Sequence, residues 1–261
     1  MIRLDKFLAQ ADVARRKKAR ILIKEGQVKV NGSIITDPAT EINELKDYVE
    51  YENCKLLAKE NRYYMFHKPG GCITAKSDIQ HKTVFEYLKE EHRAGMFPVG
   101  RLDKDTEGLL LFTNDGNFEH ALMHPKKHVE KTYYFWALGC MDQEKGKIIE
   151  SGVDIGEEEL TLPAKLYVEG IYFLKDLTEQ HSYEFLRRKQ YPKNQLVTCG
   201  KLTILEGRKH QVKRMLKAVG CYVIYLKRIQ IGNLKLDETL EKGQYRCLTK
   251  EELNLLLNQC N

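Results

Sequence analysis

The apolar positions at the start of the chain follow two different periods. Between residues 4 and 23 they recur three and four residues apart, which predicts two short amphipathic helices. The residues in this pattern are Leu4, Phe7, Leu8, Ala19, Leu22 and Ile23. From Gln27 the pattern changes to alternation, and Asn31-Gly32 is a hairpin turn before a second strand that begins at Ile34. We therefore expect a small helix-hairpin module over residues 1–45, followed by a linker over 46–60.

The remaining residues, 61–261, are dominated by strand patterns. Short apolar or alternating runs predict strands over 63–66, 108–113, 131–138, 160–168, 201–205 and 222–226. Helical periodicity predicts helices over 83–91, 117–123 and 210–219. Because the strands are long and the helices few, we expect a body built on an antiparallel or mixed sheet. The predicted fold class of the whole chain is α+β.

One stretch of this body places a polar turn directly before a buried strand. Residues 100–116 read GRLDKDTEGLLLFTNDG, in which the apolar run 109–112 is bounded by glycine and turn residues. Asp103 lies on the turn, at a surface edge where a carboxylate can act on a substrate. The alternative is that Asp103 only caps the turn, as we expect for Asp105.

Composition excludes several classes of protein. The 261 residues are 42% hydrophobic and 31% charged, which is ordinary for a soluble globular protein. No apolar stretch approaches the roughly 20 residues that cross a bilayer, and the polar start MIRLDKFLAQ does not resemble a secretory signal. We therefore expect a cytoplasmic protein without a membrane partner. Neither a dinucleotide fingerprint nor a phosphate loop occurs.

Neither the cysteines nor the histidines predict a metal site. The seven cysteines are scattered without a CxxC pair, which fits free thiols better than a zinc ribbon or a disulfide framework. His120, His124 and His128 recur at helical spacing, but Pro125 should interrupt that helix. No carboxylate or cysteine cluster joins these histidines, so we expect a solvated or RNA-facing set and no metal.

Positive charge is concentrated at the start of the chain. The formal net charge is +6, and the first 32 residues hold nine lysines and arginines against three acidic residues. The densest cluster comprises Arg15, Arg16, Lys17, Lys18 and Arg20. Such clustering on a helix-hairpin module favours binding to RNA phosphates over an ordinary solvated helix face.

Five segments resemble the landmarks of the RsuA-type ribosomal RNA pseudouridine synthases, in the family's order. They are His67-Lys68-Pro69, Arg101 to Asp115, Lys131-Thr132-Tyr133, Glu206 to Met215 and Gly243 to Leu253. The helix-hairpin module resembles the alpha-L RNA-binding module first seen in a small-subunit ribosomal protein. This resemblance covers nearly the whole chain and implies an enzyme that isomerises a uridine of ribosomal RNA. It favours small-subunit rRNA as the substrate and leaves large-subunit rRNA open.

The implied reaction breaks the bond between ribose and a ring nitrogen and rejoins the base through carbon 5. It needs no cofactor and no redox change, but it needs one ionised carboxylate in a closed pocket. The resemblance assigns this role to Asp103. It also implies that Lys213 keeps the carboxylate ionised, with Arg214 as the fallback, and that Tyr133 is the platform under the flipped uracil.

Strand alternation leaves one question open at this platform. Tyr133 and Phe135 should share one face of their strand, and Tyr134 and Trp136 the other. The sequence does not say which face meets the substrate.

Further cations are expected at the RNA. Arg101 is placed to hold the backbone or fill the gap left by the extruded nucleotide, with a salt bridge to Glu107 as the alternative. Lys68 stands at the entry of a turn, which is consistent with a backbone contact. His210 and Arg214 share one face of the predicted helix over 210–219 with Lys213, and Arg208 leads into that helix. We expect a monomer whose partner is ribosomal RNA or a pre-ribosomal particle.

Two other functions stay open at this stage. A non-catalytic RNA-binding or ribosome-assembly factor would have no reason to keep Asp103 in a groove meant for phosphates. A glycosidase would need two facing carboxylates, and Asp105 and Glu107 have no second motif to support them. The segment 181–200 is an inserted basic loop with aromatic residues, which either contacts RNA or is a surface loop without a role.

Overall fold

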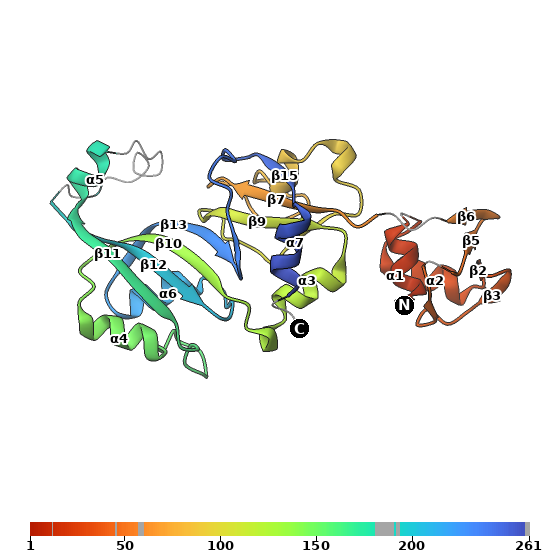
Figure 1. Cartoon of the computed structure of the whole chain (residues 1–261), viewed down its shortest axis with the longest axis horizontal. Coiled ribbons are helices and arrows are strands. Elements are labelled where there is room, and N and C mark those ends of the chain that lie inside the picture. The colour runs from red at the N-terminus through yellow and green to blue at the C-terminus, as the bar shows by residue number, and fades with distance from the viewer. Residues whose placement is uncertain (12, 45, 57–59, 181–190, 192–193, 259–261) are drawn as a thin grey trace. The chain divides into compact units, whose positions relative to one another are not determined.

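The computed structural model divides the chain into two compact units (Figure 1). It describes all residues except 12, 45, 57–59, 181–190, 192–193 and 259–261. The first unit comprises residues 1–62 and 89–97, and the second comprises 63–88 and 98–261. Within the described residues, no helix is long and apolar enough to cross a bilayer.

The first unit contains the two helices and the hairpin that the sequence predicts. Its helices are α1 (Leu4–Gln10) and α2 (Arg16–Lys24), and its larger sheet has the order β3-β2-β5-β6. The strands are β1 (Ile2–Arg3), β2 (Val28–Val30), β3 (Ser33–Ile35), β4 (Glu41–Ile42), β5 (Val49–Tyr51) and β6 (Cys54–Leu56). Strands β1 and β4 form a separate pair, and a 3-10 turn, η2 (Glu90–His92), also belongs to this unit. The apolar stripes of both helices pack on the sheet in one core.

The sheet of this unit extends past residue 45, into the segment assigned to a linker. Strand β5 pairs with β2, and a turn at Glu52 and Asn53, with φ of 51° and 59°, leads into β6. Val49 is fully buried in the same core as Phe7 and Val28. Residues 49–56 are therefore part of the unit, because their strands extend its sheet and Val49 is buried in its core.

One buried carboxylate fastens this unit together. The Asp5 side chain has no exposed surface, and its oxygens lie 2.7 Å from Arg20 Nε, 3.2 Å from Arg16 Nε and 3.3 Å from Arg3 Nε. Burial raises the pKa of Asp5, but hydrogen bonds from the three arginines outweigh burial and lower it to about 2. Arg16 and Arg20, which the sequence assigned to RNA, are thus half-exposed ion-pair partners of Asp5.

The Asp5 cluster should make the stability of the first unit depend on acid pH. Its folded-state pKa of about 2 lies below the ordinary 3.8. The carboxylate therefore contributes stability that is fully present above about pH 4 and is lost as the pH falls toward 2. We expect the Asp5 carboxylate to contribute about 2 kcal/mol to the free energy of unfolding, and this contribution should be absent in Asp5→Asn. Calorimetric unfolding of both proteins from acid to neutral pH checks this, and parallel pH profiles would contradict it.

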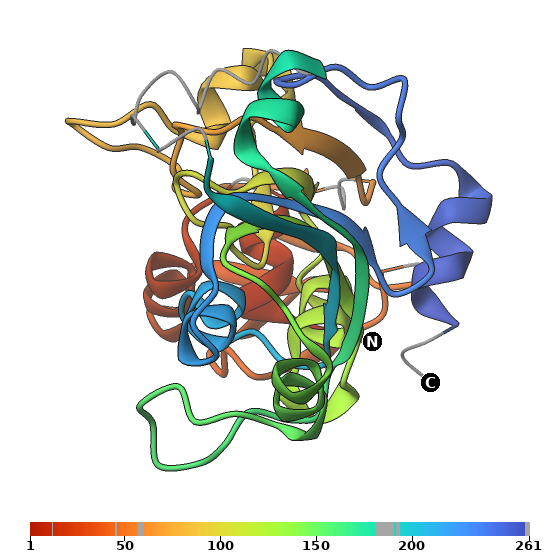
Figure 2. The same cartoon turned by 90° about the vertical axis from the view of Figure 1, so that its left-hand side faces the viewer.

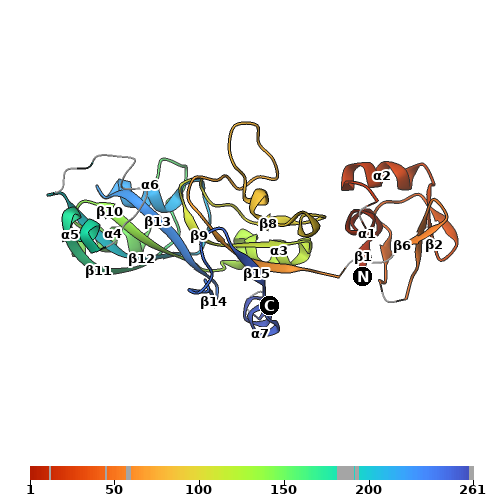
Figure 3. The same ribbon diagram turned by 90° about the horizontal axis from the view of Figure 1, so that it is seen from above.

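The second unit is built on one mixed sheet. Nine strands of the described residues form it, in the order β11-β12-β10-β13-β9-β7-β15, with β14 beside β13 and β8 beside β9. They are β7 (Tyr63–Lys68), β8 (Phe97–Val99), β9 (Glu107–Thr113), β10 (Lys131–Leu138), β11 (Lys165–Phe173), β12 (Leu196–Ile204), β13 (Tyr222–Ile231), β14 (Leu234–Lys235) and β15 (Tyr245–Cys247). Strands β9 and β13 run parallel at the centre (Figure 3). The predicted α+β fold class is confirmed.

Helices cover both faces of this sheet. They are α3 (Gly116–Met123), α4 (Gln143–Ser151), α5 (Leu174–Gln180), α6 (Gln211–Ala218) and α7 (Lys250–Leu257), with 3-10 turns η1 (Val84–Tyr87) and η3 (Pro125–Lys127). Figure 2 shows α4 and α6 on one side of β10, β12 and β13, and α5 on the opposite side. Helices α3 and α7 pack on the half of the sheet that contains β7 and β9.

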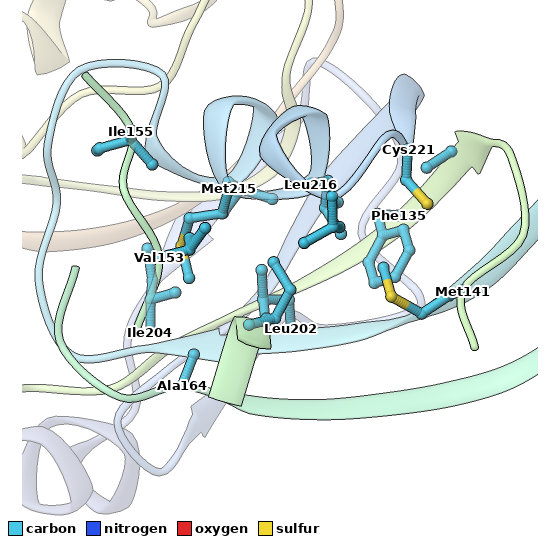
Figure 4. Close-up of a cluster of buried hydrophobic side chains, with 14 of the residues drawn as sticks. Phe135, Met141, Val153, Ile155, Ala164, Leu202, Ile204, Met215, Leu216 and Cys221 are labelled. Atoms are coloured by element: carbon cyan, nitrogen blue, oxygen red, sulfur yellow. The ribbon is translucent and has the colours of Figure 1, made fainter. Parts of the chain in front are cut away.

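The core under α6 fixes the position of that helix. Figure 4 shows Met215 and Leu216 of α6 close to Leu202 of β12 and Phe135 of β10, and all four side chains are fully buried. Burying a side chain of this kind contributes about 1.5–3 kcal/mol. Because this apolar face is fixed against the sheet, the side chain of Lys213 is left on the face that lines the candidate site.

The predicted helix over 83–91 is wrong. In its place stand the 3-10 turns η1 and η2, which belong to different units. Thr83 and Glu86 form a capping box at the start of η1, but Leu88 already has extended backbone, with φ of −82° and ψ of 140°. A single turn, closed at its start by the hydrogen bond from the Thr83 N–H to the Glu86 side chain at 2.7 Å, thus takes the place of a helix.

The predicted strand over 160–168 is displaced. Strand β11 begins at Lys165 and continues to Phe173. Pro163 has no N–H to give to a neighbouring strand, and the Leu162 N–H donates to the Glu206 side chain at 3.0 Å. These two residues keep the first part of the apolar run out of the sheet.

Candidate active site

The candidate catalytic residue, Asp103, lies in the loop between β8 and β9. Thr74 fastens this loop through one hydroxyl: its Oγ1 accepts from the Leu102 N–H (3.1 Å) and donates to the Leu102 carbonyl (2.8 Å). The Thr106 N–H donates to the Asp103 carbonyl at 3.2 Å. The Asp103 carboxylate is therefore held on a short, stiff loop, as a polar turn before a buried strand predicts.

Lys68 stabilises the same loop from below. Its ammonium group is completely buried and donates to the carbonyl oxygens of Thr106 (2.9 Å), Pro69 (3.1 Å) and Lys104 (3.3 Å). Burial lowers the pKa of Lys68. The prediction that Lys68 contacts the RNA backbone is therefore wrong, because all three donors of its ammonium are used inside the protein.

The Asp103 carboxylate faces two basic side chains of the segment that begins α6. Lys213 Nζ lies 3.0 Å from Asp103 Oδ2, and His210 Nε2 lies 3.5 Å from Oδ1. Lys213 Nζ also lies 2.5 Å from Asp105 Oδ1, so one ammonium group joins two carboxylates. About a quarter of the Asp103 and Lys213 side chains is exposed, against 74% for Asp105. Asp103 is thus the more enclosed of the two carboxylates.

The turn before α6 positions Lys213. His210 has left-handed backbone, with φ of 54°, which only a few per cent of residues other than glycine adopt and which here starts the helix. Gln211 is buried and ties the turn together: it accepts from the Arg208 N–H (2.9 Å) and donates to Glu206 (2.8 Å). The first turn of α6 is therefore anchored on both sides.

Arg208 and Arg214, which the sequence assigned to RNA, are both engaged in contacts within the protein. Arg208 donates to Glu206 and to the carbonyl oxygens of residues 159 and 160, and Arg214 donates to Glu157 and to the carbonyl oxygen of Ile155. Both guanidinium groups thus hold the loop between α4 and β11. Arg208 nevertheless lies in the wall of the candidate cavity, and the partner of Asp103 is Lys213 and not Arg214.

The tertiary structure decides which face of β10 meets the candidate site. Tyr133 and Phe135 belong to the core under α6, whereas Tyr134 and Trp136 pack on the opposite face near α5. The Trp136 Nε1–H donates to the Tyr134 hydroxyl at 3.0 Å. Tyr133 is therefore the aromatic residue that shares a face with Lys213.

These side chains line one cavity of about 1000 Å³. Asp103, Tyr133, His210 and Lys213 all contribute to its wall. A volume of this order accommodates a nucleotide. The four residues, which the sequence motifs identified separately, are thus brought together in one cavity. Lys131 and Arg228 also line it, and the sequence did not predict them as site residues. Lys131 could have been found from the sequence, because it belongs to the Lys131-Thr132-Tyr133 segment. Arg228 lies in no such segment, so no sequence signal identified it.

Arg101 also lines this cavity and is exposed. Among the described residues it has no ion-pair partner. Its expected alternative partner, Glu107, is instead bound by Lys242 Nζ at 2.8 Å and by the Tyr225 hydroxyl at 3.0 Å. Arg101 therefore remains available to an RNA ligand.

The histidines at helical spacing do not lie on one helix. Helix α3 ends at Met123, and His128 follows η3 with left-handed backbone. The rings of His120 and His124 are in contact, with centroids 4.7 Å apart. In the part of the chain that the structure describes, no group of three or more histidine, cysteine or acidic residues could hold a metal ion.

Two family profiles match the chain. One describes RNA pseudouridylate synthases and matches residues 62–218, which is more than half of the chain. The chain belongs to this family. The other profile describes the S4 domain and matches residues 2–44 of the synthase. The synthase is therefore an RNA isomerase with an S4 domain at its start, and the resemblance inferred from the sequence motifs is confirmed.

Named relatives align with nearly the whole synthase. It is 39% identical to the uncharacterized RNA pseudouridine synthase YtzG of Bacillus subtilis, over 98% of both chains. It is 34% identical to ribosomal small subunit pseudouridine synthase A of Haemophilus influenzae, over 98% of this chain and 100% of the relative. It is 38% identical to ribosomal large subunit pseudouridine synthase B of Bacillus subtilis, over 98% and 96%. A crystal structure described as a pseudouridylate synthase has a TM-score of 0.64 at 34% identity, covering 98% and 100%.

Two of the five clustered cations in the S4 domain of the synthase are ion-paired in the structure. Arg15, Lys17 and Lys18 are exposed at the start of α2, whereas Arg16 and Arg20 bind Asp5. The predicted basic insertion over 181–200 lies mostly outside the described residues.

Proposed function

We propose that the synthase converts a uridine of ribosomal RNA to pseudouridine and that Asp103 is its catalytic carboxylate. One observation carries this proposal: Asp103 lies 3.0 Å from Lys213 Nζ, in a cavity whose wall also includes Tyr133. An adjacent ammonium group favours the ionised form of a carboxyl when a base displaces water from the site. The arrangement fits a reaction that requires one charged carboxylate next to the substrate.

The proposed roles follow from the chemistry of the isomerisation. The uridine leaves its helix and places its ribose next to Asp103, which either attacks C1′ or removes a ribose proton. Lys213 holds the carboxylate ionised, and the Tyr133 ring supports the detached uracil while it turns. Every atom of the product is already present in the uridine, so the reaction uses no cofactor.

A glycosidase is a poorer fit to the same site. Such an enzyme places a second carboxylate across the scissile bond. Glu107 is engaged by Lys242 and Tyr225, and Asp105 is largely exposed and shares Lys213 with Asp103. Neither carboxylate is placed as an independent acid.

Ribosomal RNA is proposed as the substrate from the names of the relatives. Relatives named for the small subunit and for the large subunit are similarly identical to the synthase, at 34% and 38%. We propose a small-subunit uridine first, with large-subunit rRNA as the second candidate. Mapping pseudouridine in both rRNAs, from cells with and without this gene, tests the proposal. Loss of one pseudouridine is the expected result, and unchanged maps would overturn it.

The exposed S4 cations should provide salt-dependent RNA binding. Replacing Arg15, Lys17 and Lys18 with alanine should weaken binding to rRNA transcripts and flatten its salt dependence. Each lost phosphate contact lowers the slope of log K against log salt by about 0.7 to 0.9. Filter binding at several salt concentrations measures this slope.

A matched control removes three exposed lysines from the second unit instead. Lys147, Lys235 and Lys250 lie outside the cavity, and their replacement with alanine changes the net charge equally. This control should leave the slope nearly unchanged. Equal slopes for the two triple variants would contradict a docking role for the S4 cations.

A further inference from the structure

Two buried cations in the cavity wall have no role in the chemistry described so far. Arg228 is 2% exposed and Lys131 is 7% exposed, and both line the cavity that contains Asp103 and Tyr133. Neither forms an ion pair with a carboxylate of the described residues. Arg228 Nε donates to the Leu109 carbonyl at 2.8 Å, but its Nη2 is buried without a hydrogen-bond partner in the described part of the protein.

The strand register places both cations beside the aromatic platform. Lys131 and Tyr133 pair with Ile204 and Leu202 of β12 without a register shift, so they point to the same face of β10. Arg228 of β13 lies directly across from Tyr133. Paired residues on neighbouring strands share a face. Lys131, Arg228 and Tyr133 are therefore neighbours on the side of the sheet that carries α6.

The charges of Lys131 and Arg228 also act on each other. Burial lowers the pKa of Lys131, and the positive charge of Arg228 lowers it further, to about 8. Buried cations are ordinarily paired with carboxylates, because an uncompensated charge in the interior costs several kcal/mol. Two adjacent cations without such partners form a site prepared for negative charge from a ligand.

We propose that Lys131 and Arg228 bind the carbonyl oxygens of the extruded uracil and stabilise the negative charge that the ring acquires when it leaves ribose. This inference rests on the proposed function, in which Asp103 opens the glycosidic bond. Groups that are fixed before the reaction and aimed at developing charge stabilise a transition state strongly. Lys131 and Arg228 are accordingly catalytic residues that act on the uracil, whereas Asp103 acts on the ribose.

The electron balance of the step explains why such groups are needed. When the C1′–N1 bond breaks, its electron pair stays with the ring, whose charge spreads to the two carbonyl oxygens. The ribose has lost this electron pair. Asp103 compensates for the loss either by bonding to C1′ or by taking a ribose proton. Carbon 5 then bonds to C1′ while the Asp103–C1′ bond breaks or, in the other route, while Asp103 returns the proton to the ribose. The proton of carbon 5 leaves and N1 gains one, so the ring becomes neutral without an oxidant or a reductant.

Burial favours the base over an RNA phosphate as the ligand of this pair. Phosphates lie on the outside of the nucleic acid, where the exposed cations of the cavity wall, Arg101, Lys104 and Lys209, can meet them. Lys131 and Arg228 are almost completely buried next to Tyr133, where only the flipped ring would reach them.

The test uses transcripts of the organism's own 16S and 23S rRNA, with tritium at carbon 5 of uridine. Release of tritium by the unaltered protein establishes the isomerase activity first, and no release would refute the proposed function rather than this inference. Lys131→Met and Arg228→Met should then lower the single-turnover rate by about 100-fold. The affinity for RNA should change less than about threefold, because phosphate contacts dominate it.

Conservative variants separate charge from packing. Lys131→Arg and Arg228→Lys keep the positive charge and should recover the rate to within about tenfold of the parent. If Arg228→Met melts below the assay temperature, the two Lys131 variants alone decide the question, because the ammonium group of Lys131 makes no hydrogen bond within the described residues. Lys201→Met removes a lysine of β12 outside the cavity, bound to Glu169 at 3.1 Å, and should keep the parental rate.

A change of leaving group distinguishes stabilisation of the base from mere positioning. Fluorine at carbon 5 makes uracil a better leaving anion. Cleavage of the C1′–N1 bond should therefore depend less on the two cations. In transcripts with 5-fluorouridine, the rate deficit of Lys131→Met should shrink by about tenfold, measured as C-linked product by mass spectrometry of the digested RNA. Equal deficits with both transcripts, or a rate loss matched by lost RNA affinity, would overturn the inference.

Discussion

We expect Asp103→Asn to abolish pseudouridine formation while RNA binding is kept. Asparagine has the shape of aspartate but can neither attack C1′ nor take a ribose proton, so the rate should fall by about 10⁴-fold or more. Removing one negative charge beside Lys213 and His210 should leave RNA affinity unchanged or raise it slightly. Single-turnover tritium release and filter binding, on the same tritiated transcripts, measure the two quantities.

Asp105→Asn is the matched control for this variant. Asp105 contacts the same ammonium group of Lys213 but is 74% exposed. Its amide variant should lose less than about tenfold in rate, because a largely exposed ion pair contributes little. Full turnover by Asp103→Asn, or equal losses in the two variants, would refute the role proposed for Asp103.

The second large effect is expected on stability, from Gly108→Ala at the centre of the sheet. Gly108 has φ of +102°, and an added Cβ would lie 2.2 Å from the carbonyl oxygen of Arg228. This contact lies where β9 runs parallel to β13 and joins the two halves of the sheet. Backbone strain and overpacking together should cost on the order of 4 kcal/mol. Thermal unfolding should show a melting temperature lower by about 10 °C.

Gly146→Ala tests whether any added methyl group has this effect. Gly146 lies in α4, and its added Cβ would make only an ordinary contact of 3.6 Å with Leu166. Alanine favours a helix over glycine by about 1 kcal/mol, so this variant should be as stable as the parent or more stable. A melting temperature for Gly108→Ala within about 2 °C of the parent would contradict the close approach of the two strands.

Much of the fold was predictable because its signals are local. Asn31-Gly32 defines a hairpin by its turn chemistry alone, and β10 occupies the predicted residues 131–138. The expected helix over 83–91 failed because one capped 3-10 turn satisfies the same apolar pattern. The sequence pattern did not predict helices α4, α5 and α7.

The site was predictable only in part. The motifs that resemble the family identified Asp103, Tyr133 and Lys213, and the structure brings these residues to one cavity. The predicted cations divided into two groups. Arg101 remains free of ion pairs within the described residues, whereas Lys68 is fully buried and stabilises the catalytic loop.

By itself the sequence determined the α+β class, the rigid turn that carries Asp103 and the concentration of basic residues at the start of the chain, because periodicity, turn chemistry and charge are properties of short segments. Only the tertiary structure decided which cations are free and which face of β10 meets the site. A long basic side chain binds whichever carbonyl or carboxylate the fold brings near it: the partners of Lys68 and Arg214 include residues 38 and 59 positions away in the chain. Such distant contacts leave no pattern in the local sequence.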